Sequence, residues 1–229
     1  MYMLKPALME WVEIPAGKTT LADGAGVFQV PAFRMGRTPV TNGQFTAFVK
    51  DGGYRNALWW HDLGPAPSGA RASNWREDES PKVQVCWYEA VAFCRWLASH
   101  TGTAVRLPTE AEWQWAAAGP SGWEYAYGSG FDGTKCNTRE AGNGRANLVT
   151  EYARVKTPFG AVDMTGNVWE WCGNRAESPA EASIEEGGTR ALRGGSWENT
   201  QQHAKVTFRY NRAVPTRTYT IGFRVMAEH

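Results

Sequence analysis

Tryptophan is the residue that most limits the folds open to this chain. Twelve tryptophans stand beside twenty-five glycines and twelve prolines in a sequence of 229 residues. Large flat side chains dominate the packing of a core, whereas glycine and proline interrupt helices and strands. The combination predicts an aromatic core threaded by turns and irregular loops. It argues against long regular helices.

The balance of charge excludes several classes of partner. The chain has 24 basic and 23 acidic residues, a formal net charge of +1, which creates no field to attract nucleic acid or anionic lipid. The start, "MYMLKPALMEWVEIPAG", has one lysine and no long apolar run, so it predicts neither a secretory signal nor a membrane span. We expect a soluble protein, cytoplasmic by default, with no nucleic-acid partner and no membrane span.

The cysteines do not predict a disulfide framework. They are too few and too scattered for a chain of this length, and none forms a CxxC pair. The chain is long enough to bury a core without disulfides. Cys94 and Cys172 are interpreted as small buried hydrophobic residues. The four cysteines are Cys86, Cys94, Cys136 and Cys172.

Three short helices can be placed from their local signals. Thr41 with Gln44, and Thr109 with Glu112, each form a capping box, the pattern that starts a helix. Between them, apolar residues over 90–97 recur at i, i+3, i+4 and i+7, which predicts a third amphipathic helix. The glycines expected to end the second and third helices along the chain are Gly102 and Gly119.

The remaining sequence predicts short strands and long loops. Stretches 119–166 and 174–188 are rich in turn residues and are interpreted as loops, the second one polar, acidic and exposed. The chain contains no internal repeat and no linker, so we expect one domain over residues 1–229. Short β segments are predicted at "EWVEIPAG", "GVFQVPAFRMG", "TRALRGGSW" and "IGFRVM".

Six motifs follow one another in a specific order: "MGRTPVTNGQFTAFV", "VCWYEAVAFCRWL", "RLPTEAEWQWAAAG", "DMTGNVWEWC", "RGGSW" and "IGFRV". Together they resemble the formylglycine-generating-enzyme (sulfatase-modifying factor) family, from about Glu10 to Val225. The resemblance implies an α+β, C-type-lectin-like fold. This fold has a small twisted antiparallel sheet, two main helices and much irregular chain.

The same resemblance implies specific metal chemistry, which must be carried over residue by residue. The oxidases of the family hold copper through two cysteines soon after the "GGS" motif, and these places fall at about Asn199 and Ala204. Neither residue is a thiol, so the soft ligands that select Cu(I) are missing. The related sulfoxide synthases hold iron through three histidines on a separate helical bundle. Here the histidines are isolated, at His61, His100, His203 and His229.

The last thirty residues resemble a different branch of the same fold, the variable proteins of diversity-generating retroelements. Such segments begin "GGSW" and close "IGFR", with an internal arginine. Here Trp197, Arg209 and Ile221 are spaced by twelve positions each. The resemblance implies a non-enzymatic protein whose segment 194–224 is diversified and binds a protein or other surface ligand. We therefore predict that the chain is not an enzyme and needs no copper or iron.

A segment pinned at both borders can change its outward side chains while buried anchors keep the fold. Trp197, Ile221 and Phe223 are the predicted anchors. Tyrosine and arginine in such a segment favour binding, because both are enriched at interface hot spots. The alternative is that Phe208 and one of the tyrosines fill the core. The predicted ligand-binding residues are Asn199, Thr200, His203, Phe208, Tyr210, Arg212, Thr218, Tyr219 and Thr220.

The stretch "DMTGNVWEW" is a candidate calcium site. Two carboxylates, Asp163 and Glu170, bracket a tight turn that can point carbonyl oxygens at a cation. The alternative is that Glu170 is buried as the partner of an arginine such as Arg193 or Arg224. By the family resemblance, a structural calcium ion would be held by Asp163, Gly166, Val168 and Glu170.

Two other functions remain open at this point. One is a metal-dependent oxidase of the formylglycine-generating or sulfoxide synthase type, using Cys86, Cys172 or a nearby histidine. The other is an inactive accessory homologue within a larger assembly. Metal analysis separates the first from a ligand-binding protein, since stoichiometric copper or iron would support an oxidase.

Overall fold

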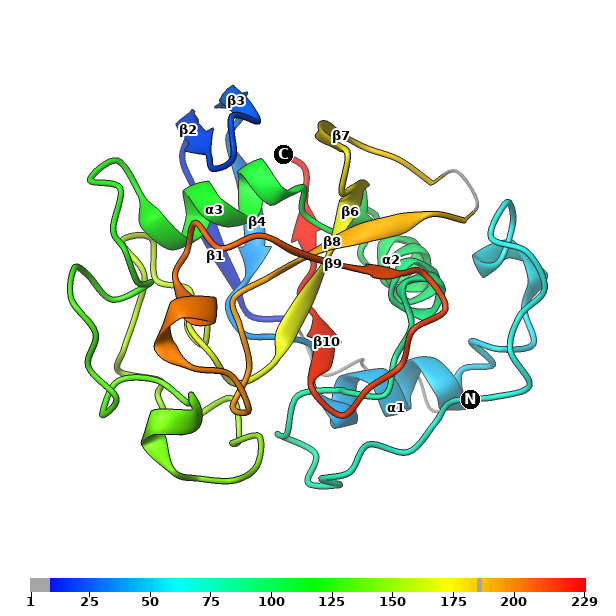
Figure 1. Ribbon diagram of the computed structural model, residues 1–229. Helices are drawn as coiled ribbons and strands as arrows, with labels where there is room; N and C mark the ends of the chain where they lie inside the picture. Colours follow the sequence, from blue (N-terminus) through cyan, green and yellow to red (C-terminus); the bar gives the residue numbers. More distant parts are fainter. Residues whose placement is uncertain (1–8, 185–186) are drawn as a thin grey trace.

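The computed structural model of the chain describes residues 9–184 and 187–229 (Figure 1). The helices in this part are α1 (Asn42–Lys50), α2 (Trp87–Thr101) and α3 (Glu110–Ala118), with short 3-10 turns at Ala57–Trp59, Arg139–Ala141 and Gln201–Ala204. The strands are β1 (Trp11–Ile14), β2 (Gly17–Leu21), β3 (Gly26–Val30), β4 (Phe33–Gly36), β5 (Val105–Arg106), β6 (Trp169–Arg175), β7 (Ser178–Ala182), β8 (Thr189–Arg193), β9 (Tyr210–Ala213), β10 (Ile221–Phe223) and β11 (Met226–Ala227).

The helices begin and end where local sequence signals predict. Both capping boxes are present, Thr41 with Gln44 before α1 and Thr109 with Glu112 before α3. In each box the threonine oxygen and the N3 side chain accept hydrogen bonds from backbone N–H groups that would otherwise have no partner. Gly102 ends α2 with a left-handed φ of 67°. None of the helices within the described ranges is long and apolar enough to cross a bilayer.

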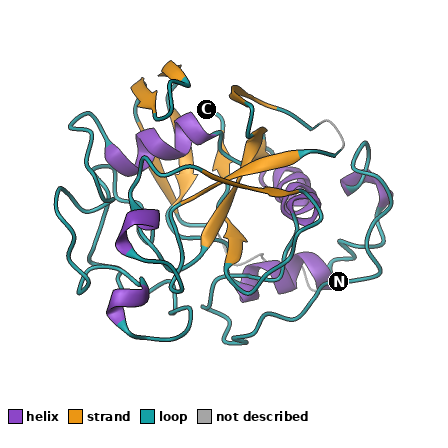
Figure 2. Cartoon of the chain, viewed as in Figure 1, coloured by secondary structure: helices purple, strands orange, loops and turns teal. Residues whose placement is uncertain are grey.

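The strands form three small sheets. One has the order β1-β4-β11-β5, the second has the order β10-β6-β8-β9 with β7 also paired to β6, and β2 pairs with β3. Most neighbours are antiparallel, and β10 with β6 is a parallel pair. Figure 2 shows loops connecting these short elements over much of the chain. The structure therefore confirms the predicted α+β, C-type-lectin-like fold.

Aromatic side chains fill the core, as the tryptophan content predicts. One cluster joins α1, α2 and β10, where the rings of Phe45, Phe93 and Phe223 lie 5.4–6.2 Å apart. A second cluster lies under α3 and includes Trp113, which is fully buried. Large rings at these spacings contribute about 0.5–1.5 kcal/mol per pair beyond the area that they bury. Both clusters include residues of β6 and β8, so both pack against the sheet with the order β10-β6-β8-β9.

The prediction of an exposed loop over 174–188 is wrong for its first part. Asn174 lies in β6 and is fully buried, and β7 pairs with β6. The polar composition suggested an exposed loop. Asn174 can nevertheless be buried because its side chain donates to Glu110 Oε1 at 2.9 Å. The stretch 119–166 is loop-like as expected, with one short 3-10 turn.

Candidate functional site

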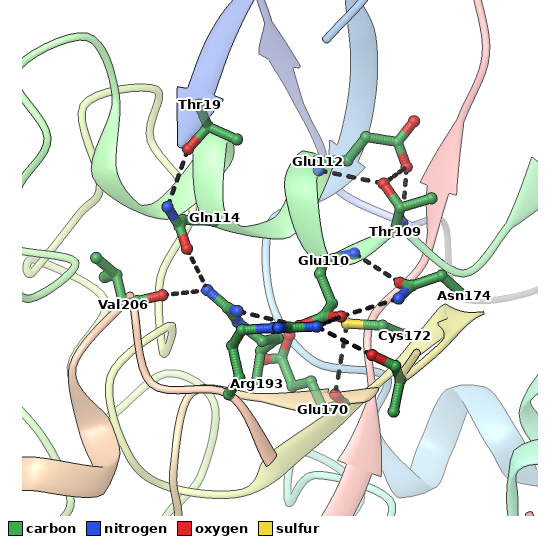
Figure 3. A network of polar contacts seen from close by, with 12 residues as sticks. Thr19, Thr109, Glu110, Glu112, Gln114, Glu170, Cys172, Asn174, Arg193 and Val206 are labelled. Carbon is green, nitrogen blue, oxygen red and sulfur yellow. Dashed lines mark hydrogen bonds and ion pairs between the residues drawn. The ribbon is translucent and has the colours of Figure 1, made fainter. Parts of the chain in front are cut away.

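A buried carboxylate ties the C-terminal segment to α3 (Figure 3). Glu110 begins α3 and is fully buried. Its Oε2 accepts from Arg193 Nη1 at 3.2 Å and from Arg209 Nε at 2.8 Å, while its Oε1 accepts from Arg209 Nη2 at 3.0 Å. One carboxylate therefore pairs with two arginines, one in β8 and one just before β9. Both parts of the chain are held against the same helix.

Arg193 makes this contact part of a longer network. Its Nη2 donates to Gln114 Oε1 at 2.6 Å and to the carbonyl oxygen of Val206. Gln114 in turn donates to Thr19 Oγ1 at 3.0 Å, which reaches the β2–β3 hairpin. Burial lowers the pKa of Arg193, and the charge of Glu110 opposes that shift. The network gives partners to both Nη atoms of a guanidinium that has no exposure to solvent, while its Nε has none in the described part of the chain.

A second arginine pair fixes the end of the segment. Arg224 donates to both oxygens of Glu170, from Nε at 3.0 Å and from Nη2 at 2.8 Å. Its remaining N–H groups donate to backbone carbonyls, including Val162 O at 2.8 Å. Trp113 Nε1 also donates to Glu170, at 2.6 Å. The structure thus shows the arginine partner for Glu170 that was the alternative to a calcium ligand.

A third pair holds the loop before β10. Arg217 Nε donates to Glu89 Oε2 at 2.8 Å, and Glu89 is buried near the start of α2. Glu89 also accepts from the Tyr54 hydroxyl at 2.5 Å and from Cys86 N at 2.8 Å. Burial, with the charge of Glu89 second, raises the pKa of Tyr54. Removing one partner of a buried ion pair costs about 3–5 kcal/mol, so these contacts hold the segment firmly.

The predicted anchors are not equally buried. Ile221 and Phe223 are 2% and 0% exposed. Trp197 is only partly buried, and its ring lies 5.7 Å from the ring of Trp75 and 6.0 Å from that of Tyr219. The border near Trp197 is therefore a partly exposed aromatic cluster, while the border at β10 belongs to the core.

Between these fixed points the segment forms a pocket, called here the polar pocket. Its volume is about 210 Å³, the size of a small metabolite rather than of a drug-sized ligand. Strands β6, β9 and β10 and the 3-10 turn at Gln201–Ala204 contribute side chains to it. The residues that line it are Trp169, Glu198, Asn199, His203, Tyr210, Arg212, Thr218, Thr220 and Ile221.

Two of these side chains are held in fixed orientations. Asn199 Oδ1 accepts from Trp169 Nε1 at 2.9 Å and from Ser196 Oγ at 2.6 Å. Its amide nitrogen therefore remains a donor with no partner among the described residues. His203 Nδ1 lies 3.1 Å from Thr200 Oγ1, and its Nε2 has no partner in the described part of the chain. Both groups can form hydrogen bonds to a ligand.

Aromatic rings and two charges complete the pocket. The rings of Trp169 and Tyr210 lie 5.1 Å apart, and the guanidinium of Arg212 lies 4.3 Å from the centre of the Tyr210 ring. No carboxylate of residues 9–184 or 187–229 lies within ion-pair distance of Arg212. Glu198 supplies a carboxylate, which accepts from the Tyr219 hydroxyl at 2.8 Å. The pocket thus presents a cation, an anion and an aromatic surface to one ligand.

The structure brings together six of the nine predicted ligand-binding residues. Three predicted residues lie beside the pocket rather than in its lining. Thr200 contacts His203, Phe208 packs against the core, and Tyr219 is 38% exposed. The lining also includes Trp169, Glu198 and Ile221, which were not among the predicted ligand-binding residues. The six lining residues that were predicted are Asn199, His203, Tyr210, Arg212, Thr218 and Thr220.

The residues of the predicted calcium site lie close together in sequence but face different partners. Asp163 is 9% exposed, and its Oδ2 accepts from Asn167 Nδ2 at 2.9 Å. Burial raises the pKa of Asp163 to about 7. Gly166 has a positive φ of 78°, and an added Cβ would lie 2.2 Å from the Asn137 carbonyl oxygen. Calcium at Asp163, Gly166, Val168 and Glu170 stays a prediction.

The side chains in the described ranges do not fit copper or iron. The four cysteines are buried and unpaired. Burial raises the pKa of Cys86 to about 12 and that of Cys136 to about 11, and it also raises those of Cys94 and Cys172. These thiols are protonated at neutral pH, whereas the thiolate is the ligand form. Residues 9–184 and 187–229 contain no group of three or more His, Cys, Asp or Glu placed to hold a metal ion.

The fold and the arrangement of these motifs define a class of C-type-lectin-like domains. The sulfatase-modifying factor enzyme 1-like domain matches residues 5–229. This chain belongs to that family.

Its relatives include proteins of known activity. Hercynine oxygenase of Mycolicibacterium thermoresistibile is 31% identical over 221 residues, which cover 81% of this chain and 48% of the relative. Formylglycine-generating enzyme of Streptomyces coelicolor is 28% identical, covering 93% of this chain and 87% of the relative. Inactive C-alpha-formylglycine-generating enzyme 2 of Bos taurus is 26% identical, covering 93% and 86%. The chain thus spans about half the length of the hercynine oxygenase.

Two solved structures show the same fold. Treponema denticola variable protein 1 has a TM-score of 0.71 and 23% identity, with 96% of this chain and 95% of that chain covered. PvdO from Pseudomonas aeruginosa has a TM-score of 0.73 and 23% identity, with 96% and 94% covered. At this identity the likeness concerns the fold alone.

These relatives correct one prediction. The chain was expected not to be an enzyme, because Asn199 and Ala204 stand where the copper cysteines would be. That expectation is wrong, since hercynine oxygenase and formylglycine-generating enzyme are both enzymes and both match the chain. A missing cysteine pair removes one metal site and leaves open other chemistry on the same fold.

Proposed function

We propose that this chain is the substrate-binding part of an oxidase-type enzyme of its family, and that the polar pocket is the substrate site. One observation carries the proposal. Arg212 has no carboxylate partner and donates to the Asn211 carbonyl oxygen at 3.4 Å, while the Asn199 amide nitrogen has no acceptor among the described residues; both side chains line the same pocket. Oriented donors without a protein partner are the usual means by which a small pocket selects a polar ligand.

The charges of the pocket favour a ligand that carries both a carboxylate and a positively charged nitrogen. Arg212 offers a guanidinium to the carboxylate, because arginine matches the geometry of two carboxylate oxygens. Glu198 and the rings of Trp169 and Tyr210 suit the cationic end, since aromatic faces attract cations. His203 Nε2 lies free to exchange a proton with the ligand.

The polar pocket is not proposed as the site of the redox metal. No described group of side chains suits copper or iron. Since the chain spans about half the length of the hercynine oxygenases, we infer that a separate segment or subunit would supply the metal. The role of this chain is then to bind and orient the substrate.

Isothermal titration calorimetry with hercynine, the compound in the name of these relatives, tests the substrate site. We expect binding to the wild-type chain and a loss of at least tenfold for Arg212→Gln, because a hydrogen-bonded charge pair contributes about 1.5–3 kcal/mol. His203→Gln is expected to weaken binding too. Arg76→Gln, at an exposed position outside the pocket, is the matched control. Equal affinity for all variants would refute the pocket as the substrate site.

The same face supports a second candidate function, recognition of a protein or surface ligand. The observation that favours it is the exposure of Arg212 and Tyr219, with the Tyr219 ring 6.0 Å from the half-buried ring of Trp197. Tyrosine, tryptophan and arginine dominate interface hot spots. Replacing Tyr210, Arg212 and Tyr219 together is expected to abolish binding to a captured ligand while the melting temperature barely moves. A fall of many degrees would show that these side chains support the fold instead.

A further inference from the structure

A second cavity, called here the apolar cavity, lies between α2 and the chain around Ala182–Ile184. Its volume is about 360 Å³, within the range of small-molecule sites. It shares no lining residue with the polar pocket. The residues that line it are Trp87, Val91, Cys94, Arg95, Val105, Arg106, Leu107, Gly173, Ala182, Ser183 and Ile184.

The walls of this cavity are mostly hydrocarbon. Trp87, Val91 and Cys94 come from one face of α2, and Leu107 faces them from the chain after β5. Ile184 is a large apolar residue that is 50% exposed. Water gains few hydrogen bonds in such a space, so an apolar ligand is favoured over ordered solvent.

Arg95 gives the cavity a single available positive charge. Its Nη1 donates to the carbonyl oxygens of Trp59 and His61. Its other N–H groups have no partner, and no carboxylate lies within 4 Å, in residues 9–184 and 187–229. Arg106 is different, because Glu112 and Glu228 already neutralise its guanidinium. The Asp62 carboxylate contacts His61 and acts on Arg95 from beyond ion-pair distance. A guanidinium with no anion paired to it, at the edge of an apolar space, suits an amphipathic anion.

We propose that the apolar cavity binds a medium-chain fatty acid, with the alkyl chain between α2 and Ile184 and the carboxylate on Arg95. The proposal assigns a site that is independent of the polar pocket and of the substrate proposed for it. Charge complementarity selects a carboxylate rather than a neutral or cationic head group. The apolar walls select an unbranched hydrocarbon tail.

A chain-length series tests the tail. We would titrate hexanoate, octanoate and decanoate into the protein and measure affinity by calorimetry. Each buried methylene contributes about 0.8 kcal/mol, which is roughly a fourfold gain in affinity. We expect the affinity to rise with chain length until the cavity is filled and then to level off. Affinity that does not depend on chain length would overturn the proposal.

Two comparison ligands test the head group. Decan-1-ol and decyltrimethylammonium have a tail of nearly the same length as decanoate but a neutral or a positive head. We expect both to bind at least tenfold more weakly than decanoate, because a charge-assisted hydrogen bond contributes about 1.5–3 kcal/mol. Equal affinity for decanol and decanoate would show that Arg95 does not bind the head group, and would overturn the proposal.

Three variants locate the site. Arg95→Gln should weaken decanoate at least tenfold and leave decanol unchanged, whereas Val91→Phe should fill the cavity and weaken both ligands. Arg76→Gln, an exposed arginine elsewhere, is the matched control for charge. Ile184→Ser removes apolar contact at the exposed end of the cavity and should also weaken decanoate. This variant tests the cavity even if Val91→Phe does not fold. Unchanged decanoate affinity in Arg95→Gln and Ile184→Ser would overturn the assignment.

Discussion

Replacing Glu110 by glutamine removes the negative charge that Arg193 and Arg209 share. Arg193 has no exposure to solvent, and its other partners, Gln114 and the Val206 carbonyl, are neutral. Leaving a buried charge without its partner costs about 3–5 kcal/mol. We therefore expect Glu110→Gln to lower the free energy of unfolding by about that amount. At about 2–4 °C per kcal/mol for a chain of this size, the melting temperature falls by roughly 6–20 °C.

Urea unfolding, followed by circular dichroism, measures this change. Glutamine has nearly the volume of glutamate, so the substitution creates no cavity and isolates the charge. The control is Glu77→Gln, which breaks an ion pair between two exposed side chains, Glu77 and Arg145, 2.7 Å apart. Solvent screens such a pair, and we expect no measurable change in the urea midpoint for the control.

A double-mutant cycle tests the shared carboxylate directly. Arg209→Gln should destabilise the wild-type protein more than it destabilises the Glu110→Gln variant, because its charge partner is already gone in the latter. The reasoning is refuted if Glu110→Gln costs no more than Glu77→Gln. It is also refuted if the effects of Glu110→Gln and Arg209→Gln add within error.

Three further predictions concern other parts of the fold. Burial lowers the pKa of Lys82 to about 8 from 10.5. The wild type should therefore gain stability relative to Lys82→Met as the pH rises between these two values, by about 2–3 kcal/mol between pH 7.5 and 10 in urea unfolding. A difference in stability that stays constant with pH would contradict the effect of burial on Lys82. Gly222→Ala should cost about 1–3 kcal/mol in the same assay, because its Cβ would lie 2.6 Å from the Lys82 carbonyl oxygen; an unchanged urea midpoint would show that β10 shifts freely. Calcium at 100 times its dissociation constant should add about 2.7 kcal/mol to the stability of the wild type and nothing to that of Asp163→Asn. A melting temperature of the wild type that changes neither with calcium nor with a chelator would refute the site.

Local sequence signals were enough to place the helices. Thr41, Thr109 and Gly102 mark helix ends through contacts within three or four residues, so their roles are visible in the sequence. The order of the six motifs predicted the fold class through their resemblance to the formylglycine-generating-enzyme family. Four of the strand regions were also predicted from short alternating runs.

The buried ion pairs could not be predicted with their partners. Arg209 pairs with Glu110 across 99 positions, and Arg217 pairs with Glu89 across 128. No spacing rule connects residues so far apart, and an isolated arginine suggests a surface side chain. The alternative partner Arg224 for Glu170 was foreseen only because a buried carboxylate requires a cation.

The polar pocket was predicted in part. Its residues on the C-terminal segment were found because that segment was expected to face a ligand. Trp169 was missed because the stretch around it was interpreted as a metal-binding turn, whereas it lies in a strand that pairs with β10. The pairing of Trp169 in β6 with Ile221 in β10 brings the Trp169 ring to the pocket. This strand register is set in the folded sheet and cannot be read from the sequence of either strand alone.

Strand β11 lies between β4 and β5, so Met226 pairs with both Met35 and Arg106. The first sheet therefore cannot be completed during synthesis until the ribosome has released nearly the last residues of this sequence. Contacts this distant slow folding, because a long loop must close before they contribute. In a chain that ends before β11, the edges of β4 and β5 that pair with β11 would stay unpaired. Unpaired strand edges favour aggregation, so premature termination would promote aggregation through this sheet.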